Sequence, residues 1–343
     1  MKRSIRSSAL ILAVAASLAP WSGGTEARQN APAFPRLQGP YLGQSVPDAV
    51  PRPFAPGIVS CGFSTRDVAM TPDGGEIFFS VSAFGFNSVF HSRLVDGAWT
   101  EPALASFARD TRYMTYEPHI SPDGKQLLFL SDKPRVEGGE RNQDLWAAVR
   151  SPGGWGEPVL LGGTISTDDA EFFPSLTRDG TLYFTRQPKG DRISYIFRSR
   201  RKDGAYGPAE KLGPEVNCGT NRFNAFVDPD ERFLIVPSAG MPDSVGDTDY
   251  YVVFRNDRDE WSRPVNMGRT INTPSGREFS ASLSPDGKYL FFMTTRPNPA
   301  VPDMLSRGAY LELLGAWVKP GSGNCTIYWV DAGFIARLRP SGF

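Results

Sequence analysis

A four-residue turn motif recurs five times along the chain at nearly even intervals. Its copies resemble Ser/Thr-Pro-Asp-Gly and begin at Thr71, Ser121, Thr177, Asp228 and Ser284. The motif aspartates lie 50, 56, 51 and 56 residues apart. Proline second, aspartate third and glycine fourth are the residues that favour a tight β-turn. A regular period of this length indicates a repeat architecture.

The fourth copy departs from the motif, because Glu231 stands where the other copies have glycine. A non-glycine residue in the left-handed conformation costs on the order of 1 kcal/mol. We therefore expect the turn at Asp228 to be of a different type from the other four.

Each turn is followed by a short apolar run that does not alternate with polar residues. The five runs are residues 77–79, 127–130, 182–184, 233–236 and 290–292. A continuous apolar run indicates a strand that is covered on both faces. A third run follows in each unit, and a fourth opens with an aromatic residue and a proline, as in Trp99 to Pro102. Proline suits an outer strand, so each unit has the pattern of a four-stranded antiparallel propeller blade.

The fifth unit has no fourth strand of its own before Phe343. Residues 53–60 resemble the segment that leads into the third unit, and we expect them to join the last blade. Ring closure of this kind removes exposed strand edges. The sequence thus predicts an all-β, five-bladed propeller over residues 53–340, closed by an N-terminal strand and preceded by an extended segment at 28–52. Six blades are the alternative count.

The first 27 residues have the pattern of a secretory signal peptide. Lys2 and Arg3 precede an uncharged apolar run over residues 8–20, and small residues lead to Ala27. The run is shorter than the ~20 residues that a membrane span requires. We expect cleavage after Ala27, no membrane span in the mature chain, and a periplasmic or secreted location. A retained N-terminal anchor is the alternative.

The charge balance argues against a nucleic-acid partner. Without residues 1–27 the chain carries 34 basic and 36 acidic side chains. Binding to a phosphate backbone calls for a basic stripe, which this balance does not favour. We therefore expect no nucleic-acid partner.

Two of the units resemble the Pro-Asp-type, WD-like propeller repeats of TolB and its relatives. The resemblance rests on Glu117-Pro-His-Ile-Ser-Pro-Asp-Gly-Lys125 with the strand after it, and on residues 277–293. It extends over roughly residues 60–335. The resemblance implies an envelope or extracellular protein that recognises other molecules, often proteins. TolB-like propellers usually have six blades, so a count of five departs from that family's pattern, and such repeats serve many roles.

Three cysteines remain after export, and two of them occupy neighbouring strand ends in the predicted ring. Cys61 ends the closing segment, and Cys325 begins the third strand of the last unit. A Cys61–Cys325 disulfide would lock the closure in an oxidising compartment. Three buried thiols, Cys218 included, are the alternative, because sequence does not fix connectivity.

Candidate binding residues lie on the innermost strands, six and eight positions before the turn aspartates. They are mostly polar and are expected at the channel mouth: Asp67, Glu117, Glu171, Arg222, Asn224 and Glu278. Residues two apart in a strand point to the same side, which is why the two positions are grouped. His119 also lies on an innermost strand and could face the channel. For each residue the alternative is a solvated or paired structural group.

Catalytic and metal signatures are sparse. The chain has two histidines and no HExxH, CxxC, GxSxG or Walker pattern, so we expect no metal and no cofactor. The first functional hypothesis is a non-catalytic recognition module for a protein, peptide or glycan. The alternative is a carbohydrate-active enzyme with paired carboxylates drawn from Asp67, Glu117, Glu171 and Glu278. A third and weaker reading is a propeller of the kind attached to serine peptidases, without the hydrolase half.

The link between the second and third strands of the fifth unit is unusually long. It spans residues 296–324 and contains an apolar stretch over residues 310–318. Long loops are usually functional or disordered, and the aromatic content argues against disorder. The segment is predicted to form a small helix or a hairpin that covers the mouth or presents a partner surface. An insertion that packs against the first blade is the alternative.

Overall fold

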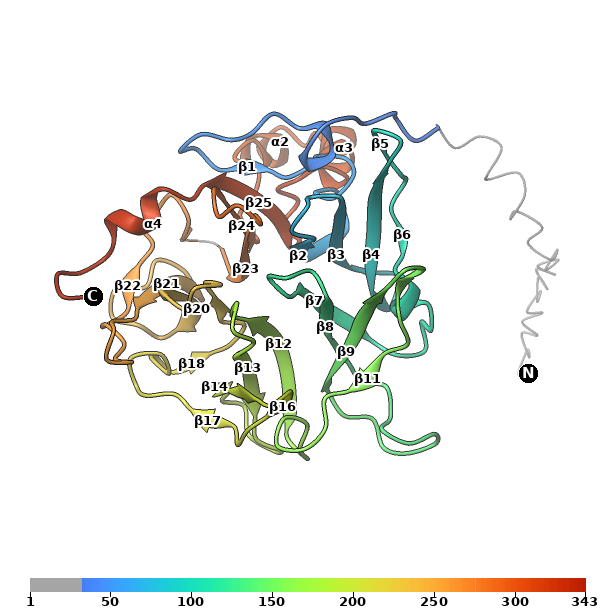
Figure 1. Ribbon diagram of the computed structural model, residues 1–343. Coiled ribbons are helices and arrows are strands. Elements are labelled where there is room, and N and C mark those ends of the chain that lie inside the picture. The colour runs from blue at the N-terminus through green and yellow to red at the C-terminus, as the bar shows by residue number, and fades with distance from the viewer. Residues whose placement is uncertain (1–32, 275) are drawn as a thin grey trace, which may run out of the picture. The chain divides into compact units, whose positions relative to one another are not determined.

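The computed structural model describes residues 33–274 and 276–343, and residues 37–343 form one compact unit. The expected signal peptide at 1–27 lies outside the described residues. Five antiparallel sheets stand around a common centre (Figure 1). The predicted five-bladed β-propeller of four-stranded blades is therefore confirmed.

From the innermost strand outward, the strands of blades 1 to 4 follow chain order, and only the outer strand of blade 5 comes from the start of the described chain. Blade 1 consists of β2 (Ser64–Met70), β3 (Glu76–Ala83), β4 (Phe86–Val95) and β6 (Ala103–Leu104). Blade 2 consists of β7 (Thr115–Ile120), β8 (Gln126–Ser131), β9 (Asp144–Ser151) and β11 (Val159–Leu160). Blade 3 consists of β12 (Ala170–Leu176), β13 (Leu182–Gln187), β14 (Tyr195–Ser199) and β17 (Glu210–Lys211).

In blade 4 the innermost strand is split into β18 (Asn221–Arg222) and β19 (Phe226–Val227). The blade continues with β20 (Phe233–Ala239), β21 (Asp249–Phe254) and β22 (Val265–Asn266). Blade 5 consists of β23 (Glu278–Leu283), β24 (Tyr289–Thr294), β25 (Thr326–Asp331) and β1 (Arg52–Pro53).

The leading segment closes the ring, as the sequence predicts. Strand β1 pairs with β25 in antiparallel register, with Arg52 opposite Trp329. The backbone N–H of Phe54 continues the ladder to the carbonyl of Ile327 at 2.9 Å. The Phe54 ring is fully buried, and its centroid lies 5.3 Å from that of Trp329. The segment that closes the ring therefore also contributes Phe54 to the hydrophobic core of blade 5.

The outer strands begin later than the sequence pattern suggested. In blade 1 the aromatic residue Trp99 belongs to a short extra strand, β5 (Ala98–Trp99), that extends the hairpin from β4. The outer strand β6 starts after Pro102. Proline lacks the N–H that a ladder needs, so it separates the hairpin from the outer strand. The strands β10 (Gly154–Trp155), β15 (Arg201–Lys202) and β16 (Ala205–Tyr206) form the matching hairpins of blades 2 and 3.

The non-alternating apolar runs are buried on both faces. In β3 the side chains of Phe78 and Phe79 are 0% and 2% exposed. Phe79 packs in a cluster with Trp329 of blade 5, whereas Phe78 packs in a cluster with Phe129 of blade 2. Successive residues of one strand thus join the cores on its two sides, which is how stacked blades hide both faces.

All five turns share one geometry, including the one that lacks glycine. In the first turn the N–H of Gly74 donates to the carbonyl of Thr71 at 2.8 Å, and Glu231 makes the same bond to Asp228 at 2.8 Å. Glu231 has a φ of +57°, close to the +68° of Gly74. The expectation of a different turn type at Asp228 is therefore wrong.

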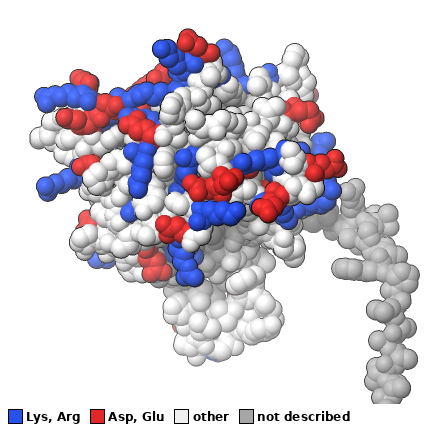
Figure 2. All heavy atoms as spheres, turned by 90° about the horizontal axis from the view of Figure 1, so that it is seen from below, with Lys and Arg blue, Asp and Glu red and all other residues white. Residues whose placement is uncertain are grey.

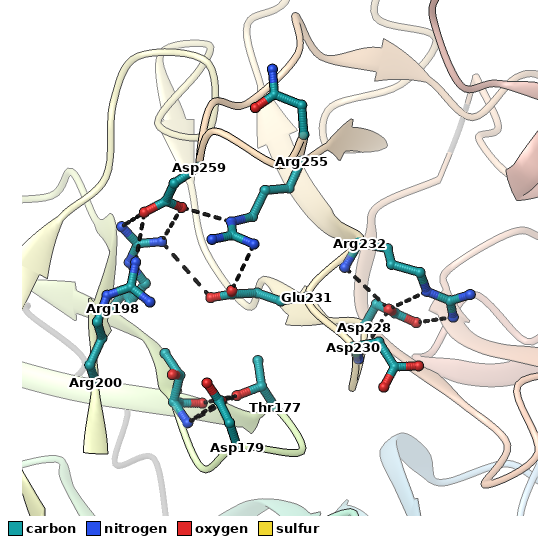
Figure 3. Close-up of polar contacts among 12 residues, drawn as sticks. Thr177, Asp179, Arg198, Arg200, Asp228, Asp230, Glu231, Arg232, Arg255 and Asp259 are labelled. Carbon is teal, nitrogen blue, oxygen red and sulfur yellow. Dashed lines mark hydrogen bonds and ion pairs between the residues drawn. The ribbon is translucent and has the colours of Figure 1, made fainter. Parts of the chain in front are cut away.

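The side chain of Glu231 explains why the left-handed position is not glycine there. Its carboxylate accepts a hydrogen bond from the hydroxyl of Tyr183 at 2.5 Å. It also pairs with Arg255 at 3.1 Å and with Arg198 at 3.9 Å (Figure 3). Asp259 bridges the same two arginines. This network ties blade 3 to blade 4 and offsets the backbone strain.

The long link of blade 5 forms two short helices, α2 (Val301–Ser306) and α3 (Tyr310–Trp317), near β1 in Figure 1. It packs beside the segment that enters blade 1, because a Cβ on Gly62 would lie 2.8 Å from the carbonyl oxygen of Trp317. Apolar side chains remain exposed, among them Leu311 and Trp317. Among the described residues no helix is long and apolar enough to span a bilayer. The other helical elements of the described residues are η1 (Tyr41–Gly43), η2 (Ser106–Ala108) and α4 (Phe334–Arg337).

Candidate functional site

Every innermost strand contains one residue in the left-handed conformation, six positions before the turn aspartate. These residues are Asp67, Glu117, Phe173, Asn224 and Ser280, with φ between +52° and +63°. The strand register shifts around this residue in blades 1, 2, 3 and 5, and in blade 4 the innermost strand is interrupted there. Such β-bulges redirect a side chain relative to a regular strand. In four blades the side chain of this residue takes part in the central contacts described next, and in blade 3 the backbone N–H of Phe173 does so.

Glu117 is the point where the blades meet. Its Oε1 accepts a hydrogen bond from Nδ2 of Asn224 in blade 4 at 3.2 Å. Its Oε2 accepts from the backbone N–H of Phe173 in blade 3 at 2.7 Å. Asn224 also donates to the hydroxyl of Ser280 in blade 5 at 3.1 Å. Blades 2 to 5 are thus joined through one carboxylate and one amide.

Blade 1 contributes an arginine to the same cluster. Arg66 donates from Nε to the Asp67 carboxylate at 2.8 Å and from Nη2 to Glu117. Its guanidinium lies 5.4 Å from the ring centroid of Tyr116 and 4.9 Å from that of Phe279. We call Arg66, Asp67, Glu117, Asn224 and Ser280 the central cluster. Its polar groups are bonded to one another rather than to solvent.

Burial raises the pKa of Glu117 to about 7, and the nearby Asp67 carboxylate adds to the rise. The Arg66 guanidinium opposes that rise, as do the Phe173 and Asn224 donors. Both Glu117 and Asp67 are only 5% exposed. A carboxylate enclosed by four blades can organise the ring, but a large substrate cannot reach it without displacing them.

The residues eight positions before the turn aspartate lie elsewhere. Glu171 accepts hydrogen bonds from Thr167 and from Nε of Arg186 at 2.8 Å. Arg222 donates to the carbonyls of Cys218 and Gly219 at 2.9 and 2.7 Å. In both cases the side chain fastens the innermost strand to the loop that leads into it.

Glu278 plays the same part in blade 5. Its Oε1 accepts hydrogen bonds from the hydroxyls of Thr273 at 2.9 Å and Thr294 at 2.8 Å. Burial raises the pKa of Glu278 to about 7. The structure therefore brings together Asp67, Glu117 and Asn224 of the predicted set and leaves Glu171, Arg222 and Glu278 between strand and loop.

His119 lies toward the opposite end of the channel, beside the five turns. Its Nε2 accepts a hydrogen bond from the backbone N–H of Leu176 at 2.9 Å. Burial lowers the pKa of His119 to about 4, so the ring is neutral. The side chain borders a cavity of about 190 Å³ that includes Pro72, Pro122 and Pro285 of the turns. This cavity is on the face away from the predicted mouth.

The predicted mouth face carries a polar groove of about 720 Å³ between blades 2 and 3. Three segments form it: residues 132–143, the approach to β12 at 168–170, and the link 187–191. Ion pairs fix the first of these, since Arg135 binds Asp144 at 2.8 and 2.9 Å and Arg141 binds Asp132. The wall formed by residues 132–143 is therefore held in place before any ligand arrives.

The three cysteines, Cys61, Cys218 and Cys325, are free thiols in the described part of the chain. The predicted Cys61–Cys325 disulfide is thus absent from the structure. Cys325 instead places its carbonyl against the N–H of Thr65 in β2 at 2.8 Å. Backbone hydrogen bonding, rather than a covalent bond, joins the two segments here.

No group of three or more histidine, cysteine, aspartate or glutamate side chains within residues 33–274 and 276–343 is placed to hold a metal ion. The charged side chains on the face shown in Figure 2 are of both signs and interspersed. The surface in that view therefore has no extended region of a single charge.

Sequence reasoning missed Arg66 and Ser280. Arg66 occupies the position whose equivalents are Tyr116, Phe172, Phe223 and Phe279. A single charged residue in an otherwise aromatic position is a signal that could have indicated it. Ser280 occupies the same position as Glu117 but carries no charge.

No family model matches the chain, and no curated protein sequence matches it. Among solved structures, TolB from Acinetobacter baumannii aligns with a TM-score of 0.42 and 12% identity over 78% of this chain and 57% of that one. This chain thus spans little more than half of the TolB chain.

Two further structures are similar in the same degree. The arabinanase of Bacillus subtilis aligns with a TM-score of 0.47 and 11% identity over 78% of this chain and 94% of that one. The periplasmic gluconolactonase of Pseudomonas aeruginosa has a TM-score of 0.37 and 13% identity over 67% of this chain and 64% of that one. These values are too low to bear on function, so the five-bladed propeller rests on the chain's own sheet topology.

Proposed function

We propose that the mature protein is an exported, non-catalytic recognition module that binds a peptide or protein segment in the polar groove between blades 2 and 3. The observation that carries this proposal is the groove itself, which combines a volume of about 720 Å³ with one wall, residues 132–143, that is fixed by ion pairs. That volume falls within the range of sites that hold a short peptide or a small molecule. A rigid site also loses less conformational entropy on binding.

The exposed groups of the groove suit a peptide. The exposed side chains of Lys189, Asp168 and Asp191 present charges of both signs, and the half-buried Gln143 and Gln187 add amides. Peptide backbones need both donors and acceptors, and side chains of either sign find a partner here. A flexible segment of another protein matches these requirements.

Hydrolysis by paired carboxylates has less support. Both groups of such a pair must reach the scissile glycosidic bond. Asp67 and Glu117 share Arg66, but each is 5% exposed and bonded within the central cluster. The remaining candidates, Glu171 and Glu278, fasten loops. We therefore favour recognition over the carbohydrate-active alternative.

Export is part of the proposal. The signal pattern over residues 1–27 supports a location in the periplasm or outside the cell. Mass spectrometry of the protein recovered from those compartments should show an N-terminus at Arg28. Recovery of the full-length chain in the membrane fraction would support a retained anchor instead.

A peptide selection tests the groove. Dodecapeptides displayed on phage are selected on the immobilised protein and then measured by isothermal titration calorimetry. The double charge reversal Lys189→Glu with Asp191→Lys should weaken binding by about tenfold or more. The matched control Lys125→Glu, on an exposed turn of the opposite face, should leave it unchanged. Selected peptides that bind the double variant as well as the wild type would contradict the assignment.

A further inference from the structure

A cavity of about 280 Å³ opens between blades 1 and 2, and most of its large side chains are aromatic. The aromatic walls are Phe107, Tyr113, Phe129, Trp146 and Trp155. A second hollow of about 420 Å³ has Ser106, Arg109 and Trp155 in common with the first. The two hollows therefore adjoin at Trp155.

Trp155 is held in a fixed orientation. Its indole N–H donates to Oε2 of Glu76 in blade 1 at 3.2 Å. Arg150 lies 4.9 Å from the ring centroid and donates to the same carboxylate oxygen at 2.7 Å. An aromatic ring fixed in this way offers a preorganised surface to a ligand.

The equivalent tryptophan of blade 1 is not available to a ligand. Trp99 is 3% exposed, and its indole N–H donates to the carbonyl of Gly39 at 2.7 Å. The segment that contains Leu37 and Gly39 thus covers Trp99. Trp155 has the same place in its blade but borders two hollows instead. Trp155 is thus half-buried, whereas the leading segment buries its counterpart in blade 1.

The charges around the hollows are balanced. Arg109 and Lys133 face Asp110 and Glu157 in the first hollow. Arg93 and Arg109 accompany Glu76 and Glu101 in the second. His91 also borders the second hollow, and burial lowers its pKa to about 4, so it adds no charge at neutral pH. These walls favour a ligand without net charge.

The hydrogen-bonding groups between the aromatic rings limit the chemical class of the ligand further. Ser106 adds an exposed hydroxyl to the first hollow, and the buried residues Thr115 and Ser131 border it, the Ser131 hydroxyl donating to the carbonyl of Met114 at 2.8 Å. The indole nitrogen of Trp146 at the same wall has no partner among the described residues. A ligand that satisfies these walls has a flat apolar face and many hydroxyl groups.

We propose that the two hollows bind a neutral oligosaccharide, with one sugar ring stacked on Trp155 and its neighbours on either side. The C–H face of a pyranose packs on the indole, while its hydroxyls bond to the charged and hydroxyl side chains at the edge. Two adjoining hollows accommodate a chain better than a single sugar. This site is separate from the peptide groove and does not depend on it.

The test is a titration with tri- to hexasaccharides of glucose, xylose, arabinose or N-acetylglucosamine, followed by calorimetry and intrinsic tryptophan fluorescence. We expect at least one series to bind, and Trp155→Ala to weaken it by about tenfold or more. Trp155→Phe retains a flat ring and should lose less. The matched control Trp317→Ala removes an exposed tryptophan from α3 and should leave binding unchanged.

A second variant tests the site even if Trp155→Ala fails to fold. Arg109 is exposed and borders both hollows, so Arg109→Ala should keep the fold and still weaken binding severalfold. The proposal is overturned if no saccharide binds, or if Trp155→Ala and Arg109→Ala bind as the wild type does. Binding of a phenylalanine-containing tripeptide in place of the saccharides would also overturn it. The Lys189 and Asp191 reversal should not alter saccharide binding, so the two sites can fail separately.

Discussion

The side-chain amide of Asn224 donates a hydrogen bond to the carboxylate of Glu117 at 3.2 Å, although the two residues are 107 positions apart in the chain. The bond runs from blade 4 to blade 2 across the centre of the ring. Asn224 tolerates its φ of +53° better than most residues, because asparagine visits the left-handed region readily. Backbone geometry and central hydrogen bonding therefore favour the same residue type.

Replacing Asn224 tests how much the central cluster contributes to stability. Asn224→Asp keeps the shape but substitutes a second carboxylate for the donor, so we expect a loss of about 3 kcal/mol in the free energy of unfolding. Asn224→Gly keeps the left-handed backbone and removes only the side chain, so we expect a loss of about 1–2 kcal/mol. Urea unfolding at neutral pH measures both. An aspartate variant as stable as the glycine variant would contradict the central placement.

Glu278→Gln should change how stability depends on pH. The pKa of Glu278 is raised to about 7 from 4.5, so its folded form favours the proton. The stability that this carboxyl contributes is full below pH 4.5 and is lost as pH rises through 7. Glutamine can still accept hydrogen bonds from Thr273 and Thr294. The variant should therefore gain about 2–3 kcal/mol relative to the wild type between pH 4.5 and pH 8.

Unfolding of both proteins at pH 5 and pH 8 measures this gain. A parallel pH dependence in the two proteins would mean that Glu278 titrates normally in the folded state.

His119→Gln should change the pH dependence of stability in the opposite direction. The pKa of His119 is lowered from 6.5 to about 4, so protonation favours the unfolded chain. The stability from neutral His119 is present above pH 6.5 and is lost as pH falls through 4. Glutamine keeps an acceptor for the N–H of Leu176 but does not titrate.

We expect the wild type to lose about 2–3 kcal/mol more than His119→Gln between pH 7 and pH 4. His91 titrates in both proteins and cancels from the comparison. Thermal unfolding across this range provides the measurement, and equal losses would show that the His119 ring is accessible to protons in the folded protein.

Glu231→Gly should destabilise the protein although it relieves backbone strain. Glycine at this position gains about 1 kcal/mol. It also removes the acceptor of the fully buried Tyr183 and a partner of Arg198 and Arg255, at a cost of about 2–3 kcal/mol. The net loss should be about 1–2 kcal/mol. Glu231→Gln keeps the Tyr183 bond, so its free energy of unfolding should lie between those of the wild type and the glycine variant. A glycine variant more stable than the wild type would show that strain outweighs the network.

Thiol counting distinguishes the structure from the disulfide prediction. The unreduced protein, unfolded in guanidinium with a thiol-reactive dye, should show three free thiols, as the structure indicates. Recovery of one free thiol would restore the Cys61–Cys325 pairing. The Cys61→Ser variant, which could not form that bond, is the control.

The contrast between Glu117 and Glu171 shows where sequence reasoning stopped. The two positions are two residues apart in the repeat, and regular strand alternation groups them on one side. The left-handed residue at the bulge interrupts that alternation, so Glu117 faces the centre and Glu171 faces its leading loop. A β-bulge at a non-glycine residue leaves no clear mark in a single sequence.

The sequence by itself determined the five units, their turns and the need to cover both faces of every strand, because turn chemistry and apolar runs act locally. The tertiary structure decided which polar groups meet at the centre and that Trp99, unlike Trp155, is covered by the leading segment. Gly39 covers Trp99 from 60 residues away, and within residues 33–274 and 276–343 no segment covers Trp155 in the same way. Contacts between such distant segments depend on how the ring closes, which local patterns do not encode.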